Sequence, residues 1–210
     1  MLPGPFYIYK CPSCGSLLSR GSLMSGNTFG AKLFSDGKMI TNMLPEFPDL
    51  TKCRKCNTIF WLSKLKEIGT YKWGANKNST WKKAKEAEFL DIDDYFRALD
   101  SKIAENKKEE LFIRLGIWRA YNDRIRSGNV IFNDKDDELR WSNNVNILLT
   151  LLDQSEINEK ITIAEIYRNK GEFDKCMNII KSIKENKYDW LKEKFINECK
   201  KQNRWVIVLN

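Results

Sequence analysis

Two short stretches decide how the first part of this chain folds, Cys11-Pro12-Ser13-Cys14-Gly15 and Cys53-Arg54-Lys55-Cys56-Asn57. Each holds two cysteines separated by two residues, a spacing that lets both thiolates of a tight turn face one cation. The second cysteine of each pair is followed by Gly15 or Asn57, residue types that readily adopt left-handed backbone angles. Two such turns supply the four sulfurs of a tetrahedral zinc shell. The predicted metal ligands are therefore Cys11, Cys14, Cys53 and Cys56.

The residues that flank the two turns are mostly aromatic or β-branched. Tyr7-Ile8-Tyr9-Lys10 precedes the first turn and Thr58-Ile59-Phe60-Trp61 follows the second, and both stretches are predicted to be strands. This arrangement resembles the zinc ribbon family over about residues 6–62. The resemblance implies one structural zinc ion, because four sulfurs close the coordination shell. The alternative is two unrelated redox or buried cysteine pairs. A thioredoxin-like redox use is disfavoured because neither cysteine pair precedes a convincing helix.

The spacing between the two turns departs from the usual ribbon. Cys14 and Cys53 are separated by 38 residues, whereas the commoner spacing uses roughly 15–20. We expect the excess to form a hairpin with arms at 33–34 and 39–40 and the turn Ser35-Asp36-Gly37-Lys38. Asp-Gly between two short apolar runs is a strong signal for such a turn.

The composition of the chain changes near residue 86. Residues 1–86 hold 14 Lys and Arg against 5 Asp and Glu, whereas residues 87–210 hold 22 against 23. All five prolines lie in the first 48 residues, and proline is excluded from long helices. We predict an α+β protein of two domains. The zinc ribbon with its inserted hairpin covers 1–65, a connector rich in lysine and aromatic residues covers 66–90, and an all-α domain covers 91–210.

From residue 91 onward the apolar residues follow a helical period. We predict six helices at about 92–105, 109–126, 137–152, 157–169, 173–183 and 189–201, with Asp91 capping the first. Residues 205–209 are expected to form a short extended segment. Cys176 and Cys199 lie within these helices and are expected to pack in the core, since buried free thiols behave as small hydrophobes. The short loops predict stacked antiparallel helical hairpins.

The fourth and fifth predicted helices share a spaced set of small and aromatic residues, namely Ala164, Tyr167, Gly171, Phe173 and Cys176. This pattern resembles a tetratricopeptide repeat over about 157–184, in which small residues let paired helices approach and aromatic residues fill the groove. Lys160 stands where the repeat usually has tryptophan, and no second good copy is present. An ordinary helical hairpin is the other interpretation. The resemblance implies a surface that binds a protein or peptide.

Lysines and aromatic residues alternate within the connector. Lysines offset phosphate charge and aromatic rings stack on bases, so the pattern is typical of a single-strand nucleic-acid surface. The candidate contacts are Lys72, Trp73, Lys77, Trp81, Lys82 and Lys83. In the competing interpretation, which we favour, the aromatic residues pack the ribbon against the helices while the lysines stay in solvent.

The chain contains no histidine, which excludes a Ser/His/Asp or Cys/His catalytic set. It also has no glycine-rich phosphate loop and no apolar run near the roughly 20 residues of a membrane span. We therefore expect a cytoplasmic, non-enzymatic zinc-binding adaptor without membrane contact, which binds a protein or peptide partner through its helical domain. The alternative is a nucleic-acid-binding protein that uses the basic ribbon and connector.

Overall fold

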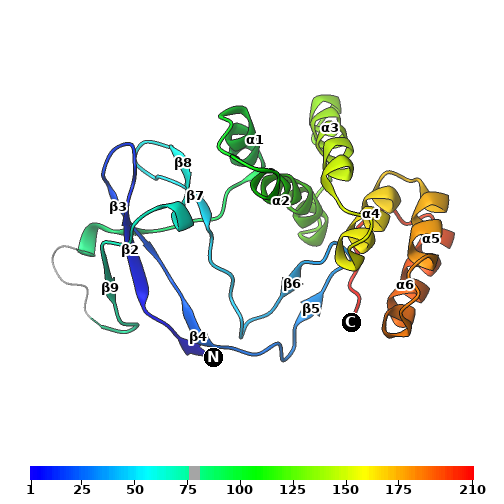
Figure 1. The fold of residues 1–210 in the computed structure, drawn as a ribbon, viewed down its shortest axis with the longest axis horizontal. Helices are drawn as coiled ribbons and strands as arrows, with labels where there is room; N and C mark the ends of the chain where they lie inside the picture. Colours follow the sequence, from blue (N-terminus) through cyan, green and yellow to red (C-terminus); the bar gives the residue numbers. More distant parts are fainter. Residues whose placement is uncertain (76–80) are drawn as a thin grey trace. The chain divides into compact units, whose positions relative to one another are not determined.

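The computed structural model describes residues 1–75 and 81–210, and the chain divides into two compact units (Figure 1). Unit 1 comprises Met1–Ala31 and Ile40–Ile103, and unit 2 comprises Lys32–Met39 and Ala104–Asn210. Small sheets predominate in unit 1 and helices in unit 2, which agrees with the predicted α+β class. The division differs from the expected boundaries at three places. The connector 66–90 and the first helix belong to unit 1, and most of the inserted hairpin, Lys32–Met39, belongs to unit 2.

A four-stranded sheet of order β10-β3-β2-β9 forms the centre of unit 1. Its strands are β2 (Phe6–Lys10), β3 (Leu17–Arg20), β9 (Gly69–Tyr71) and β10 (Lys85–Glu86). Strand β2 pairs antiparallel with both β3 and β9, whereas β10 pairs parallel with β3. Two smaller antiparallel pairs join β1 (Leu2–Pro3) to β4 (Leu23–Ser25) and β7 (Leu50–Lys52) to β8 (Ile59–Trp61).

One face of this sheet packs onto the cysteine turns. Tyr9 and Leu18 lie opposite each other in the β2–β3 register, and both are buried in one cluster with Phe60, Leu62 and Ala87. The same cluster contains Cys11 and Cys53. A core this small supplies limited hydrophobic stabilisation, and small domains commonly add a metal to compensate.

Helix α1 (Ile92–Asp100) is tied to the second cysteine turn. Asp91 caps it as predicted, because its side chain accepts from the Asp94 amide at 2.8 Å. The buried Asp94 carboxylate forms ion pairs with Lys52 of β7 and with Arg97. Arg97 also donates to the carbonyl of Asn57 at 2.7 Å. These bonds explain why α1 belongs to unit 1.

The predicted hairpin is present between the two cysteine turns. Strand β5 (Lys32–Leu33) pairs with β6 (Met39–Ile40). Gly37 has a φ of 75° in the turn, where glycine avoids the strain of other residues. The Phe34 amide donates to the carbonyl of Lys38 at 2.9 Å and closes the turn.

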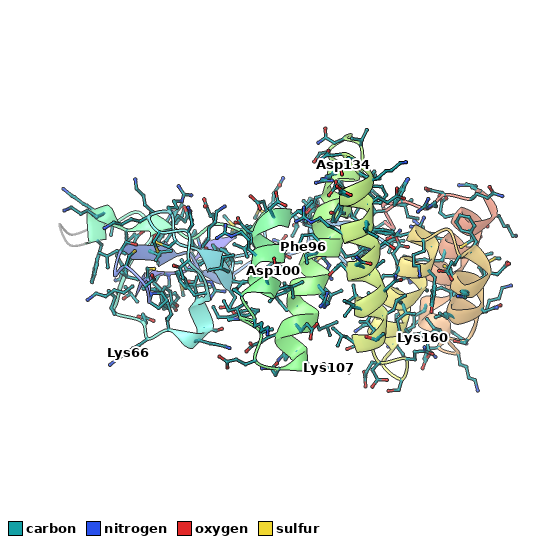
Figure 2. The ribbon with its side chains drawn as sticks, turned by 90° about the horizontal axis from the view of Figure 1, so that it is seen from above. Lys66, Phe96, Asp100, Lys107, Asp134 and Lys160 are labelled. Atoms are coloured by element: carbon teal, nitrogen blue, oxygen red, sulfur yellow. The ribbon has the colours of Figure 1, made fainter. Side chains whose placement is uncertain are left out.

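Five helices make up most of unit 2. They are α2 (Lys107–Arg126), α3 (Lys135–Leu151), α4 (Ile157–Asn169), α5 (Phe173–Lys181) and α6 (Asp189–Lys200). Figure 2 shows Lys107 at the start of α2 and Asp134 just before α3. All six predicted helices are confirmed, with ends that differ by a few residues. Helix α1 ends before the expected residue 105 because Lys102 adopts a φ of 54°.

Helices α4 and α5 form a tight hairpin through Gly171, whose φ is 80°. Ala164 and Cys176 are fully buried in a core cluster that also contains Ile180 and Cys199. Small side chains at these positions allow the two helices to approach closely. The helical hairpin and the buried thiols are confirmed, while its assignment to the tetratricopeptide repeats stays an interpretation.

The last residues of the chain pair with the inserted hairpin. The Leu209 amide donates to the Leu33 carbonyl at 2.7 Å, and the Ser35 amide donates to the Ile207 carbonyl at 3.0 Å. Phe34 and Val208 form an antiparallel bridge. The predicted extended segment at the C-terminus is therefore the neighbour of a strand that lies far away in the sequence.

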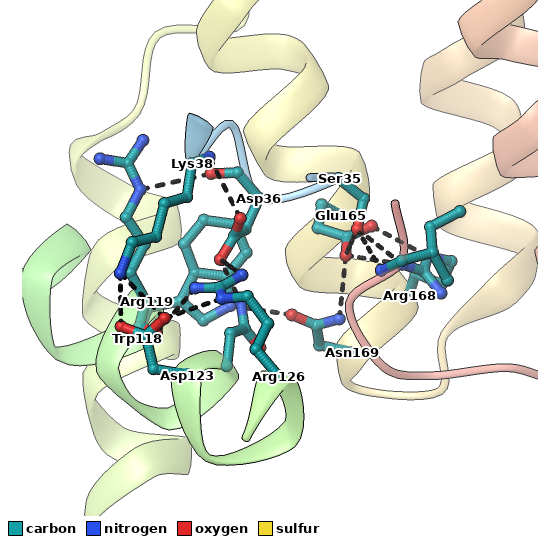
Figure 3. Close-up of polar contacts among 12 residues, drawn as sticks. Ser35, Asp36, Lys38, Trp118, Arg119, Asp123, Arg126, Glu165, Arg168 and Asn169 are labelled. Atoms are coloured by element: carbon teal, nitrogen blue, oxygen red, sulfur yellow. Dashed lines mark hydrogen bonds and ion pairs between the residues drawn. The ribbon is translucent and has the colours of Figure 1, made fainter. Parts of the chain in front are cut away.

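A buried polar network holds the hairpin turn within unit 2 (Figure 3). Asp36 accepts from Asn122 at 3.0 Å and from Arg126 at 2.8 Å, both on α2. Ser35 donates to Glu165 of α4 at 2.7 Å, and Glu165 is paired with Arg168. Buried polar groups of this kind specify one arrangement because each lost bond is costly. Among the described residues, no helix combines the length and apolarity that crossing a membrane requires.

Candidate metal centre

The four predicted ligands come together in unit 1. Their Sγ atoms all lie within 4.8 Å of one another, and they belong to Cys11, Cys14, Cys53 and Cys56. The Sγ–Sγ distance is 3.6 Å for Cys11 and Cys56 and also for Cys14 and Cys53. A tetrahedral ion with metal–sulfur bonds of roughly 2.3 Å would separate its sulfurs by about 3.8 Å. The four cysteines are thus close enough to hold one metal ion.

The two cysteine turns have the same backbone hydrogen bonds. In the first turn, the Cys11 amide donates to the Ser16 carbonyl at 2.9 Å and the Gly15 amide donates to the Cys11 carbonyl at 3.0 Å. In the second turn, the Cys53 amide donates to the Thr58 carbonyl at 2.9 Å and the Asn57 amide donates to the Cys53 carbonyl at 2.8 Å. Gly15 and Asn57 have φ values of 68° and 57°. Their predicted left-handed conformation is confirmed.

Two hydroxyl groups beside the sulfurs were not predicted. The Ser16 Oγ atom lies 3.1 Å from the sulfur of Cys14 and 3.0 Å from that of Cys53. The Thr58 Oγ1 atom lies 3.2 Å from the sulfur of Cys56. Hydroxyl donors spread the charge of a thiolate and orient metal ligands. Each hydroxyl follows the second cysteine of its pair by two residues. This shared spacing is the sequence feature from which both hydroxyl groups could have been predicted.

The four thiols differ in acidity. The pKa of Cys56 falls to about 6 because the hydroxyl and the backbone of Thr58 hydrogen-bond to its sulfur. Burial raises the pKa of Cys11 to about 12. A thiol must lose its proton to bind a metal, so a divalent cation is the group that would allow the buried Cys11 to ionise. Four thiolates leave no coordination position open, which is typical of a structural site.

The structure describes five of the six candidate nucleic-acid contacts. Trp73 is 62% exposed, and its ring lies 5.7 Å from that of Phe6. Trp81 begins a short 3-10 helix (Trp81–Lys83) and lies over Gly69, where a Cβ atom would meet its ring at 2.6 Å. The lysine side chains at 72, 82 and 83 are exposed, and Lys77 lies outside the described residues. Within unit 1, Trp81 packs on strand β9 and Trp73 is mostly exposed, while the predicted packing of the ribbon against the helices stays a prediction.

Comparison with known proteins provides no relative. No family model matches the chain, and neither a curated protein nor a solved structure matches it. Its function has to be argued from the geometry of its own residues.

Proposed function

We propose that this chain is a non-enzymatic adaptor in the cytoplasm, in which one structural zinc ion stabilises unit 1 and unit 2 binds a protein or peptide partner. The zinc assignment is supported by the donor set, because four sulfurs at these distances suit zinc, which prefers tetrahedral thiolate sites. The partner assignment is supported mainly by one observation, a groove within unit 2.

The groove has a volume of about 350 Å³ and lies between the hairpin turn, α4 and the start of α6. Most of its wall is apolar, with contributions from Leu33, Phe34, Ile161, Tyr188, Trp190, Leu191 and Leu209. Trp190 is 46% exposed at this site. Exposed tryptophans in a concave, mainly apolar site are enriched among the residues that contribute most to binding.

A guanidinium group adds charge specificity to the groove. Arg119 lines it together with Asn158 and Thr162. The Nε atom of Arg119 donates to the Asp36 carbonyl at 3.3 Å. Arginine has five N–H donors in a rigid fork, so the remaining donors of Arg119 suit a carboxylate. The expected ligand is a peptide with an apolar side chain next to an acidic group.

The groove also supports the non-enzymatic part of the proposal. No described residue that lines it is cysteine, aspartate, glutamate or lysine. Its buried hydroxyl, Ser35, donates to Glu165 at 2.7 Å. Glu165 is fully buried and already paired with Arg168 at 2.6 Å, so its carboxylate is not accessible to a substrate in the groove. The arrangement favours binding over catalysis.

The test uses the full chain, purified without chelator, and a displayed library of short random peptides. We expect selected peptides to combine an aromatic or aliphatic residue with Asp or Glu, and to lose most of their affinity for Trp190→Ala and Arg119→Gln variants. Leu139→Ala is the matched control, because Leu139 is an exposed apolar residue of α3 outside the groove. Peptides that bind all four proteins equally, or a library without enrichment, would contradict the adaptor proposal.

A further inference from the structure

Three aromatic side chains form a row on one face of the sheet in unit 1. Phe6 and Tyr71 lie opposite each other in the β2–β9 register, and their rings stack at 4.8 Å with an interplanar angle of 4°. Trp73 stacks on Phe6 at 5.7 Å and 11°. Strand β9 ends at Tyr71 and Trp73 lies in the turn that follows, where its stacking on Phe6 places it beside the other two rings. The result is a row of nearly parallel rings that ends in an exposed indole.

The aromatic row borders a groove of about 310 Å³ whose wall is mainly apolar. Ser19, Gly74 and Glu86 complete the lining. The opposite face of the same strands is buried through Tyr9 and Leu18 against the cysteine turns. The row is therefore not required to build the core around the metal ligands. Phe6 and Tyr71 are half-buried, and the exposed ring of Trp73 leaves a planar surface available to a ligand.

Three lysines are neighbours of these aromatic residues along the chain. Lys72 lies between Tyr71 and Trp73 in the chain, and Lys82 and Lys83 follow Trp81, which covers Gly69 on strand β9. All three lysines are exposed. Within the described part of the chain, none of them forms an ion pair. Their charges are available to a polyanion.

We propose that this surface binds single-stranded nucleic acid, with a base stacked on Trp73 and the phosphodiester backbone held by Lys72, Lys82 and Lys83. Stacking on aromatic rings beside lysines is the general mode by which proteins bind unpaired strands. The proposal concerns unit 1 and does not rest on the peptide-binding function of unit 2.

The arrangement of the groove decides between three kinds of ligand. A methylated ammonium group is usually held by rings that surround it, whereas Phe6, Tyr71 and Trp73 are nearly parallel. A free phosphate would meet the carboxylate of Glu86 inside the groove. A base avoids that repulsion, since its N–H groups donate to a carboxylate. A base in the groove can donate to the Glu86 carboxylate, while the phosphates of the same strand pair with the lysines.

The test measures binding of fluorescently labelled dT12 and rU12 to the zinc-loaded full chain by anisotropy, at salt concentrations from about 50 to 200 mM. We expect Trp73→Ala to weaken binding roughly 5- to 150-fold, the range found for loss of one stacked base. Trp73→Phe should retain much of the affinity because it keeps an aromatic face. Phe29→Ala, which removes an exposed ring outside the groove, should bind as the parent does.

The lysines are tested by the salt dependence of binding. Replacing Lys72, Lys82 and Lys83 by glutamine should flatten the log–log slope by up to about 2, since each single-strand phosphate contact contributes roughly 0.7. The matched control removes three exposed lysines of unit 2, Lys108, Lys181 and Lys184. Equal slopes for the two triple variants, no effect of Trp73→Ala, or no binding by the parent at 50 mM salt would overturn the proposal. Equal affinity for a duplex would also overturn it, because paired bases cannot stack on Trp73.

Discussion

Replacing Arg168 by methionine tests the polar network that holds the inserted hairpin in unit 2. Arg168 is fully buried, and its guanidinium donates to the two carboxylate oxygens of Glu165 at 2.6 and 2.9 Å. It also donates to the carbonyls of Asn203 at 2.6 Å and Trp205 at 2.9 Å. Methionine is long and flexible enough to occupy much of the same space. The variant therefore removes the charge and the donors while it keeps much of the packing.

The expected loss of stability is large because Glu165 is also fully buried. Removing one partner of a buried ion pair costs about 3–5 kcal/mol, since the other charge remains without compensation. Unit 2 has about 115 residues, for which a total stability of roughly 6–17 kcal/mol is typical. At about 4 °C per kcal/mol for a domain of this size, the Tm should fall by about 12–20 °C.

The loss should also depend on pH. Burial raises the pKa of Glu165 above its ordinary value, and the neighbouring Arg168 opposes that rise. Without Arg168 the pKa rises further, so above about pH 4.3 the folded chain binds a proton that the unfolded chain releases. Stability then falls as the pH rises, because the folded state holds more protons than the unfolded state. The Tm deficit of the variant should be smaller at pH 5 than at pH 8.

Thermal unfolding followed by circular dichroism measures both effects. Lys201→Met is the control, because it breaks a pair with Glu198 at an N–O distance of 2.7 Å in which the lysine side chain is 68% exposed. Such surface pairs contribute about 1 kcal/mol or less. The double variant Glu165→Gln/Arg168→Met should recover part of the loss and show no pH dependence at this site. An Arg168→Met protein that melts within a few degrees of the Lys201→Met protein would refute the argument.

Three further predictions concern the metal centre, the helical hairpin and the inserted turn. The variant Cys53→Ser/Cys56→Ser should abolish zinc retention in elemental analysis and make unit 1 protease-sensitive, while the helical circular dichroism signal is preserved. Structural zinc contributes roughly 10–16 kcal/mol in finger peptides. Full retention of zinc by this variant would contradict the assignment. Ala164→Trp should cost about 1–3 kcal/mol in chemical denaturation by overpacking the buried α4–α5 contact, whereas the exposed Lys181→Trp should leave the midpoint unchanged. Gly37→Ala should cost about 1–2 kcal/mol because its φ is 75°, and an unchanged denaturation midpoint would show that the turn relaxes.

Features that depend on neighbouring residues could be predicted from the sequence. The cysteine turns need only a two-residue gap and a residue that tolerates positive φ, and Gly15 and Asn57 supply it. The helices follow from their apolar period, and the predicted cap at Asp91 satisfies an amide of the first turn. The hairpin turn at Gly37 was equally visible, because Asp-Gly is a local signal.

The place of the hairpin within the fold could not be predicted in the same way. Asp36 pairs with Arg126, 90 residues further along the chain, and no local pattern encodes a contact of that range. Glu165 and Arg168 are three residues apart in α4, a spacing that is usual for exposed helix pairs. Their full burial arises only when the hairpin and the C-terminal segment cover them.

In the aromatic row, the pairing of strands decides which aromatic residues lie together, and the composition of the connector alone does not. The sequence placed Trp73 and Trp81 in the same class, since each stands next to a lysine in one connector. Pairing of Phe6 with Tyr71 then brings Trp73 onto the exposed face of Phe6, whereas Trp81 lies over Gly69. Phe6 carried no signal of its own, because its role depends on a strand more than 60 residues away. The Trp73 variants therefore test the proposed binding role separately from the packing of Trp81 on strand β9.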